Sequence, residues 1–553
     1  MSFIDSHMHF WDRGLMPYTW LHEVPSIWER HTFENLRAEA GSLLPEKVVF
    51  VEAGAPGLAE QAVRATVPPQ PGSQRASTSQ RASTSRSRQF IAIQLGARAF
   101  VDEGVEKVLD TLQEKASVNV IMPAVYTYGE GMAGRQMRGQ PPTDHGVQEY
   151  ADVVGGAYTQ VHPEFYQDSP IKDIRAPELG SFDILADVIP KAKERGIRTF
   201  ALFEEKYNPR LIPNFPKIAE VDIFGRMGTD PCFNNPHARA FLISLVEDWI
   251  KSNDLDGVMW ESERQGPLNT TIGAHFAKTR TSPRRSLSCF CEHCERKARE
   301  QGIDFRRAKD GFIALERWVN EVWGKPRKAD GSFVTLWRLL AEYPELLAYE
   351  RFWFLSQEEM YGLIYGTVKG IKPKVQVGWH IMHLVTMSPF YSADQNYARL
   401  AHIADFLKPS PYNNCGGPRL AQYVNNVSKT VFRDFTPDEV LEMHYKLMGY
   451  EKETTLDKLP QAGLSADYVF RETRRALEDV EGAVPIYPGI DIDIPTELNE
   501  KRTTPEGVGD ATLAAFRAGA PGVVLSRNYA EMRLTNLAGA GEAIRQWQAT
   551  HAG

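Results

Sequence analysis

The strongest constraint on the fold is a regular alternation of short apolar runs with amphipathic stretches, which begins at residue 89 and continues to the end of the sequence. The apolar runs have the length and composition of buried β-strands, and the amphipathic stretches repeat apolar residues at helical spacing. Strands are predicted at 91–96, 118–125, 198–203, 257–261, 375–381, 405–408, 484–490 and 522–526. Helices are predicted at 104–115, 183–195, 237–252, 349–370, 466–480, 505–518 and 538–549.

Eight strands that alternate with helices predict an α/β fold, a (β/α)8 TIM barrel, whose chemistry lies at the C-terminal ends of the strands. A doubly wound sheet is the alternative, but no Gly-x-Gly-x-x-Gly follows the first strand. The connections after the second, third and fourth strands are too long for plain loops, and the last of them runs from residue 261 to residue 375. We therefore expect long βα-loop insertions.

Two further parts precede this barrel, which is assigned to residues 89–553. Residues 1–64 read as strand, loop, helix, strand and helix, a partial β-α-β fragment. Residues 65–88 are rich in Pro, Ser, Thr and Arg and contain the hexapeptide Ser-Gln-Arg-Ala-Ser-Thr twice in tandem. A segment of this composition buries little apolar area, which predicts a disordered linker.

The composition bounds the function. Lys and Arg total 63 against 71 Asp and Glu, a net charge of −8, which disfavours a nucleic-acid partner. No apolar run is long enough for a membrane span, and the first residues do not read as a secretory signal. The odd count of five cysteines fits a reducing compartment, so we expect a cytoplasmic protein, with a homo-oligomer permitted.

The N-terminal fragment carries a His-x-His pair. His7 and His9 follow the first strand, and alternate residues there can bind one divalent metal from the same side. The stretch Ile-Asp-Ser-His-Met-His-Phe-Trp-Asp at residues 4–12 resembles the start of the amidohydrolase-2 family of metal-dependent hydrolases. The alternative is that both histidines belong to a purely structural fragment.

The sharpest motif is a Cys-x-Cys-x-x-Cys cluster formed by Cys289, Cys291 and Cys294. Three thiols at this spacing can surround one zinc ion, and a fourth ligand would close the site. Cys232 is the best fourth candidate, with Cys415 and His293 behind it. A site of four cysteines predicts structural zinc, and no organic cofactor is expected.

The predicted fourth strand ends in acidic residues. Glu261 and Glu263 follow its apolar run, at the position where a barrel displays its catalytic groups. Hydrolysis of a glycosidic bond needs two carboxyl groups, and Glu261 is the first choice for one, with Glu263 as its nearest rival. For the second, the seventh strand offers Asp491 and Asp493, and the rivals are Glu204, Glu205 and Asp405. A surface ion pair between Glu263 and its neighbour Arg264 is the alternative interpretation.

Several other side chains near strand ends are candidates for binding a small saccharide. Aromatic rings pack on the C–H faces of sugars, and polar groups bind hydroxyls. The substrate-binding candidates are Trp260, Trp379, His380, Arg527, Tyr487, Tyr126 and Glu204. Ordinary core packing is the alternative for the aromatic residues.

The order Pro-Cys-x-Asn-x-Pro, amphipathic helix, acidic strand end and Cys-x-Cys-x-x-Cys resembles the zinc-containing β-galactosidase family of barrel glycoside hydrolases over about residues 180–381. The resemblance implies a zinc site of Cys232, Cys289, Cys291 and Cys294 and an acid/base glutamate after strand four. The chain departs from the family because Trp260 precedes Glu261 where the family has Asn, and no glutamate is evident at strand seven.

Three functions follow from these observations. The first is a carbohydrate-active hydrolase that uses Glu261 with Asp491 or Asp493. The second is an amidohydrolase-type hydrolase that acts on an ester, lactone or amide through a metal at His7 and His9. The third is a non-catalytic sugar-binding barrel, because a barrel fold alone does not decide function.

Overall fold

The computed structural model describes residues 4–8, 47–50, 89–135, 140, 143–149, 153–172, 174–206, 210–278, 287–323, 325 and 329–551, the first two ranges as backbone only. The chain divides into two units, Met1–Ser87 and Arg88–Gly553. In the first unit, strand β1 (Ile4–Met8) pairs in parallel with β2 (Lys47–Phe50). The helices predicted for residues 1–64 and the linker predicted at 65–88 lie outside the described residues.

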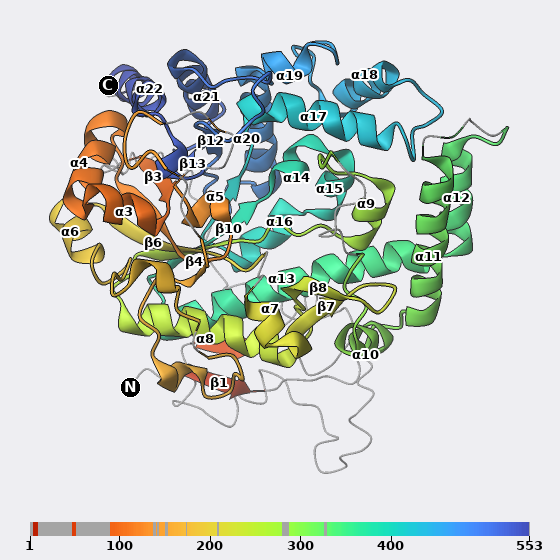
Figure 1. Cartoon of the computed structure of the whole chain (residues 1–553), viewed down its shortest axis with the longest axis horizontal. Helices are drawn as coiled ribbons and strands as arrows, with labels where there is room; N and C mark the ends of the chain where they lie inside the picture. The colour runs from red at the N-terminus through yellow and green to blue at the C-terminus, as the bar shows by residue number, and fades with distance from the viewer. Residues whose placement is uncertain are drawn as a thin grey trace, which may run out of the picture. The chain divides into compact units, whose positions relative to one another are not determined.

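The second unit is a barrel of parallel strands surrounded by helices (Figure 1). Within the described residues its strands are β3 (Phe90–Leu95), β4 (Val120–Thr127), β6 (Arg198–Glu204), β9 (Gly257–Glu261), β10 (Gln376–Ile381), β11 (Phe406–Pro409), β12 (Gly489–Asp491) and β13 (Gly522–Ser526). They pair in the order β11-β10-β9-β6-β4-β3-β13-β12. A parallel bridge between Leu407 and Ile486, just before β12, closes the ring. The predicted (β/α)8 barrel is confirmed.

Alternate residues of each strand serve two different cores. Phe90, Phe200, Met259 and Phe406 point inward and fill the barrel with small and aliphatic residues of the other strands. The residues between them, such as Trp260, point outward and pack against the helices. Because both faces are apolar, the strands are continuous hydrophobic runs in the sequence.

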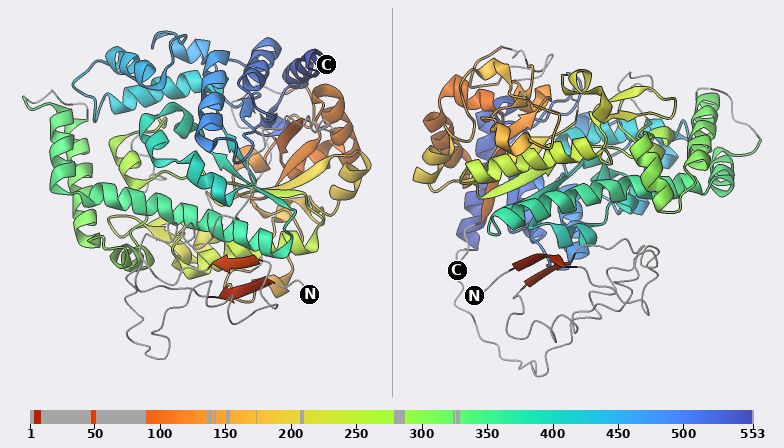
Figure 2. Two further views of the ribbon diagram at one scale, coloured as in Figure 1. Left: turned by 180° about the vertical axis from the view of Figure 1, so that it is seen from behind. Right: turned by 90° about the horizontal axis from the view of Figure 1, so that it is seen from below.

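Helices form in all seven segments where they were predicted, and they pack around the outside of the barrel. The predicted helices are α4 (Val105–Ala116), α6 (Ile189–Glu194), α8 (Pro236–Ser252), α13 (Glu345–Ile371), α20 (Ala466–Val480), α21 (Pro505–Arg517) and α22 (Leu534–Thr550). Helix α8 begins after Asn235, whose side chain accepts hydrogen bonds from the amides of His237 and Ala238. The long helix α13 packs alongside α8 (Figure 2).

Long insertions follow β4, β6 and β9, as predicted, and also β11, and the last two are mainly helical. Between β9 and β10 the chain forms α9 (Pro267–Ile272), α10 (Glu292–Glu300), α11 (Phe305–Val322) and α12 (Ser332–Glu342), and α11 and α12 stand at the edge of the barrel (Figure 1). Between β11 and β12 it forms α17 (Asn413–Val427), α18 (Pro437–Met448) and α19 (Leu459–Ala462). Among the described residues, no helix is long and apolar enough to cross a membrane.

Candidate functional site at the C-terminal end of the barrel

Polar side chains replace the apolar filling where the strands end. The alternation that points Leu202 and Met259 inward also points Glu204 and Glu261 inward, two residues later on β6 and β9. Glu204 and Glu261 are partners in the β6–β9 ladder. Partners in a parallel ladder face the same side, so both carboxyl groups lie at the inner rim of the barrel. By the same alternation the inner rim also receives Gln94 of β3, His380 of β10, Lys408 of β11 and Ser526 of β13.

Glu261 accepts a hydrogen bond at one carboxylate oxygen and faces an imidazole with the other. The amide Nε2 of Gln94 donates to Glu261 Oε2 at 2.9 Å, and Ser526 in turn donates to Gln94 Oε1 at 2.7 Å. The imidazole Nε2 of His380 lies 3.5 Å from Glu261 Oε1 and 3.2 Å from Glu263 Oε1. Three different strands therefore orient the carboxylate of Glu261.

The pKa values of Glu204 and Glu263, the two glutamates nearest to Glu261, shift in opposite directions. Burial raises the pKa of Glu204 to about 8, the negative charge of Glu261 adds to the rise, and a hydrogen bond from Thr127 at 2.7 Å opposes it. Partial burial would also raise the pKa of Glu263, but the hydrogen bond from His380 and the positive charges of Lys206 and Arg419 lower it well below its usual range. At neutral pH Glu204 therefore keeps its proton and Glu263 is a carboxylate.

Lys408 is a site residue that the sequence reasoning missed. Its side chain is fully buried, and burial lowers its pKa to about 8 although the charges of Glu261 and Glu263 oppose the shift. Its ammonium group donates to His380 Nδ1 at 3.0 Å and to the hydroxyl of Tyr412. A lysine inside an otherwise apolar strand was the signal that could have identified it, because buried lysines need partners.

Arg527 and His380 are the substrate-binding candidates, besides Glu204, that the structure brings to this rim. The guanidinium group of Arg527 binds both oxygens of Glu531 at 3.0 Å. It lies against Gly131, where an added Cβ would approach the guanidinium carbon to 2.7 Å. The close approach holds the arginine side chain beside the barrel opening.

The strand-seven aspartates are engaged elsewhere. Both oxygens of Asp491 accept backbone amides, from Cys415 at 2.9 Å and Ile494 at 3.1 Å, so the carboxylate anchors the start of α17. Asp493 forms an ion pair with Arg533 at 2.7 Å and accepts hydrogen bonds from Asn536. Within the described residues, neither carboxyl group forms a hydrogen bond or an ion pair with Glu261. The structure therefore does not pair Glu261 with either aspartate as predicted. Backbone amides bind Asp491, and Arg533 and Asn536 bind Asp493.

The two predicted tryptophans lie on the outer face of the barrel. The indole of Trp260 stacks on Phe203 at 5.8 Å and donates its N–H to Glu205. Trp379 stacks on Tyr361 of α13 at 4.6 Å and donates to the carbonyl of Ile403 at 2.8 Å. Both rings therefore pack between strands and helices instead of lining the barrel opening, which corrects their prediction as substrate-binding residues.

The two predicted tyrosines are also core residues. Tyr126 is fully buried and packs edge-on against Phe241 of α8, at 5.9 Å between ring centroids. Tyr487 stacks on Phe90 at 3.9 Å, at the start of strand β3 and hence at the opposite end of the barrel from Glu261. Neither ring is placed to contact a sugar at the C-terminal rim.

The remaining rivals for the second carboxyl group serve structural roles. Glu205 is buried on the outer face, where it forms an ion pair with Arg264 at 2.8 Å and accepts a hydrogen bond from Ser262 at 2.9 Å. This buried contact replaces the surface ion pair of Glu263 and Arg264 considered from the sequence. Asp405 precedes β11 and accepts the amide of Val377 at 2.7 Å. Glu204 is the rival that the fold places beside Glu261.

The four cysteines named from the sequence come together in one buried cluster. The ligand atoms of Cys232, Cys289, Cys291 and Cys294 all lie within 4.8 Å of one another. Cys232 Sγ is 3.5 Å from Cys291 Sγ and 3.6 Å from Cys294 Sγ. Tetrahedral Zn–S bonds of ~2.3 Å place sulfurs ~3.8 Å apart, so this donor set fits one zinc ion.

Amide donors support the sulfurs. The backbone N–H of Asn234 donates to Cys232 Sγ at 3.3 Å, and its side chain donates to Cys294 Sγ at 3.4 Å. The N–H of Val221 donates to Cys289 Sγ at 3.4 Å. Such donors stabilise thiolates, the form that binds metal. Cys415 lies apart, beside Asp491.

The side chains of the predicted metal pair, His7 and His9, lie outside the described part of the chain. His9 is not among the described residues, and only the backbone of His7 is described, within β1. The metal prediction at His7 and His9 stays a prediction.

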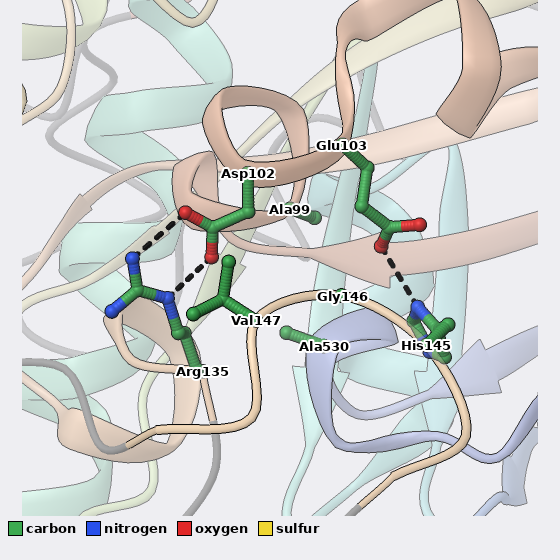
Figure 3. Close-up of a pocket in the computed structure, with 8 residues that line it drawn as sticks. All are labelled: Ala99, Asp102, Glu103, Arg135, His145, Gly146, Val147 and Ala530. Carbon is green, nitrogen blue, oxygen red and sulfur yellow. Dashed lines mark hydrogen bonds and ion pairs between the residues drawn. The ribbon is translucent and has the colours of Figure 1, made fainter.

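A small pocket lies among the segments that follow β3, β4 and β13, and its lining includes none of the rim carboxylates. Figure 3 shows its lining, with Arg135 bound to Asp102 at 2.8 Å and His145 bound to Glu103 at 2.8 Å. Its lining residues are Ala99, Asp102, Glu103, Arg135, His145, Gly146, Val147 and Ala530. The enclosed space has room for about one water molecule. These ion pairs hold a loop to α3 (Ala97–Glu103) and leave no room for a sugar.

No protein-family model matches the chain, and no curated protein matches it. Among solved structures, it is similar to α-L-fucosidase isoenzyme 2 from Paenibacillus thiaminolyticus, with 14% identity over 84% of this chain and 50% of that chain and a TM-score of 0.44. It is also similar to a β-galactosidase from the haloarchaeon Halorubrum lacusprofundi, with 15% identity over 83% and 58% and a TM-score of 0.45. The glycoside hydrolase domain of PgaB from Bordetella bronchiseptica gives 10% identity over 83% and 98% and a TM-score of 0.40.

The chain thus spans about half the length of the fucosidase and under three-fifths of that of the β-galactosidase. At these identities and TM-scores no family is assigned to the chain. Its function is inferred from the residues at the rim of its own barrel.

Proposed function

We propose that this barrel is a hydrolase that cleaves glycosidic bonds, with Glu204 as the general acid and Glu261 as the second carboxyl group. The observation that carries the proposal is the pairing of Glu204 with Glu261 in the β6–β9 ladder, at the end of the barrel where such folds place their chemistry. Glycosidases need one protonated and one ionised carboxyl group on opposite sides of the scissile bond.

The environments of the two groups support these roles. Burial and the charge of Glu261 keep the proton on Glu204 at neutral pH, because they raise its pKa to about 8. Glu204 would give this proton to the leaving-group oxygen as the glycosidic bond breaks. Glu261 accepts a hydrogen bond from Gln94 and faces His380 Nε2, an arrangement suited to a carboxylate that attacks the sugar carbon or deprotonates the attacking water.

The substrate class proposed is a small saccharide or glycoside. Beside the carboxyl pair, His380 and Arg527 offer N–H groups to hydroxyls, and Glu263 offers acceptor oxygens. The aromatic residues predicted to contact the sugar are not part of this proposal, because they are packed in the core.

The test separates the two carboxyl roles by the leaving group. Glu261→Gln should abolish hydrolysis of every glycoside in a panel of aryl and alkyl sugars. Glu204→Gln should abolish hydrolysis of alkyl glycosides but retain part of that of dinitrophenyl glycosides, whose leaving group needs no proton. Asp491→Asn is the matched control and should keep the specific activity of the folded protein.

An Asp491→Asn protein that folds but has lost all turnover would move the second carboxyl group back to strand seven. The configuration of the first-formed sugar, followed by NMR, then tells whether Glu261 attacks the sugar or activates water, because only attack by the carboxylate retains the anomeric configuration.

We also propose a structural zinc ion at Cys232, Cys289, Cys291 and Cys294. The support is the sulfur spacing and the amide donors around it. Four protein ligands leave no open position for substrate, so zinc bound here would tie the loop after β8 (Met227–Pro231) to the start of α10 and take no part in bond cleavage.

A further inference from the structure

We propose that Lys408 is a positioning residue that fixes the tautomer of His380, so that the imidazole directs a proton at Glu261 and Glu263. This inference rests on the proposed function for its catalytic meaning. Its structural content, the protonation pattern of one histidine, does not depend on turnover.

The geometry around Lys408 leaves His380 one tautomer. Lys408 and His380 are partners in the β10–β11 ladder, and both side chains are buried inside the barrel. Lys408 Nζ lies 3.0 Å from His380 Nδ1 and 3.4 Å from Ser410 Oγ. An ammonium group has three donors and no acceptor, so His380 Nδ1 must accept.

A neutral imidazole that accepts at Nδ1 carries its proton on Nε2. Nε2 is the atom that faces the carboxylates, 3.2 Å from Glu263 Oε1 and 3.5 Å from Glu261 Oε1. Lys408 therefore makes His380 a hydrogen-bond donor to Glu263, with its N–H also close to Glu261.

The same reasoning decides between two uses of this cluster. The ligand atoms of Glu261, Glu263 and His380 lie within 4.8 Å of one another, a spacing at which they could hold a divalent cation. A metal ion needs the lone pair of Nε2, which the Lys408 contact converts into an N–H. The arrangement thus favours hydrogen bonding to the carboxylates over metal binding.

The fold makes room for the lysine at one glycine. A Cβ atom on Gly489 of β12 would lie 2.9 Å from Lys408 Cε and 2.8 Å from the ring of Tyr412. Glycine at this position allows the aliphatic stem of Lys408 to cross the barrel interior. The stem is thereby packed on one side while its ammonium group reaches His380.

The direct test is the tautomer of His380 in protein labelled with ¹⁵N-histidine, assigned by comparison with His380→Gln. We expect a protonated Nε2 and an unprotonated Nδ1 in the wild type and in Tyr412→Phe, which removes a neighbouring contact but keeps the donor to Nδ1. In Lys408→Met this preference should be lost. A wild-type His380 protonated at Nδ1, or a tautomer unchanged in folded Lys408→Met, would overturn the proposal.

Kinetics and metal binding give two further arms. In Lys408→Met, kcat should fall by about 10–100-fold with KM nearly unchanged, and Lys408→Arg should recover part of kcat because a guanidinium group also only donates. When Mn²⁺ is added, the wild type should show no more bound Mn²⁺ than His380→Gln, because His380 is not expected to be a metal ligand. Mn²⁺ held through His380 in the wild type would refute the inference even if Lys408→Met fails to fold.

An inactive wild type with the expected tautomer would reject the proposed function alone. An active wild type with the other tautomer would reject the role of Lys408 alone.

Discussion

Glu204 and Glu261 stand side by side as ladder partners at the ends of β6 and β9, and each lies in the electrostatic field of the other. Two carboxyl groups in this relationship do not ionise together easily, so one keeps its proton. The proton remains on Glu204, where burial is combined with the charge of Glu261. This difference between two neighbouring side chains is the basis of the acid and base roles proposed above.

Replacing Glu261 by Gln should lower kcat on any accepted glycoside by 10³-fold or more, since a carboxylate in the transition state is lost. The melting temperature should stay near that of the wild type, because Gln can keep the hydrogen bond with Gln94. Initial rates and a thermal melt measure both quantities. Turnover equal to the wild type would remove Glu261 from the mechanism.

The dependence of kcat/KM on pH should reflect the protonation of Glu204. The general acid works only when protonated, so kcat/KM should decline as pH rises through about 8, the value to which burial and Glu261 raise the pKa of this group. In Glu204→Gln the residual hydrolysis of a dinitrophenyl glycoside should lack this alkaline decline. A decline that persists in the variant would belong to another group, such as Lys408.

The same carboxyl group should leave a signature in stability. Its pKa is raised from 4.5 in the reference state to about 8 in the folded protein, so the folded state binds the proton more tightly. The stability associated with this group is present below pH 4.5 and is lost as pH rises towards 8. The melting temperature of Glu204→Gln relative to the wild type should therefore increase across this window. A difference that does not vary with pH would contradict the shifted pKa.

Asp491 should matter for stability more than for chemistry. Its carboxylate accepts two buried backbone amides, and Asp491→Ala leaves both without a partner. The expected cost is about 3 kcal/mol of unfolding free energy, measured by urea denaturation. The folded fraction should keep its kcat.

Trp260→Phe tests whether the ring packs or binds. It removes the indole N–H that donates to Glu205 and part of the contact with Phe203, so unfolding free energy should fall by about 1–3 kcal/mol. KM should not change, because the ring lies on the outer face of the barrel. A KM raised several-fold at unchanged stability would return Trp260 to the substrate site.

Purified protein should contain one zinc ion per chain. Cobalt substitution should give the absorption of a tetrahedral thiolate site, and Cys289→Ser should lower both metal content and melting temperature. Cys415→Ser is the matched control and should keep the metal, since Cys415 lies beside Asp491 and apart from the cluster. Metal content unaffected by Cys289→Ser would place the ion elsewhere.

The architecture was readable from the sequence because a buried parallel strand and an amphipathic helix each leave a local pattern. For each of the eight strands, at least one end falls within two residues of the predicted position. The strands at 257–261 and 522–526 match the prediction at both ends. The cluster of four cysteines was also predicted, because Cys289, Cys291 and Cys294 are close in sequence and only Cys232 comes from a distant segment. Glu261 was placed at a strand end by the same local reasoning.

The face that each residue presents was decided by the tertiary structure. A barrel strand is apolar on both faces, so its sequence cannot show that Trp260 turns towards the helices while Glu261 turns inward. The partner of Glu261 depends on which strands are neighbours. The ring order puts β6 beside β9, and so selects Glu204 over Asp491, whose oxygens are taken by the amides of Cys415 and Ile494.

What the sequence determined by itself is the set of elements and the kinds of side chain at their ends, because these depend on contacts a few residues apart. What only the tertiary structure decided is which of those side chains meet. Lys408 shows the reason: its effect on His380 comes from ladder pairing between β10 and β11 and from the space left by Gly489 on a third strand. Such a relationship exists only after the barrel closes.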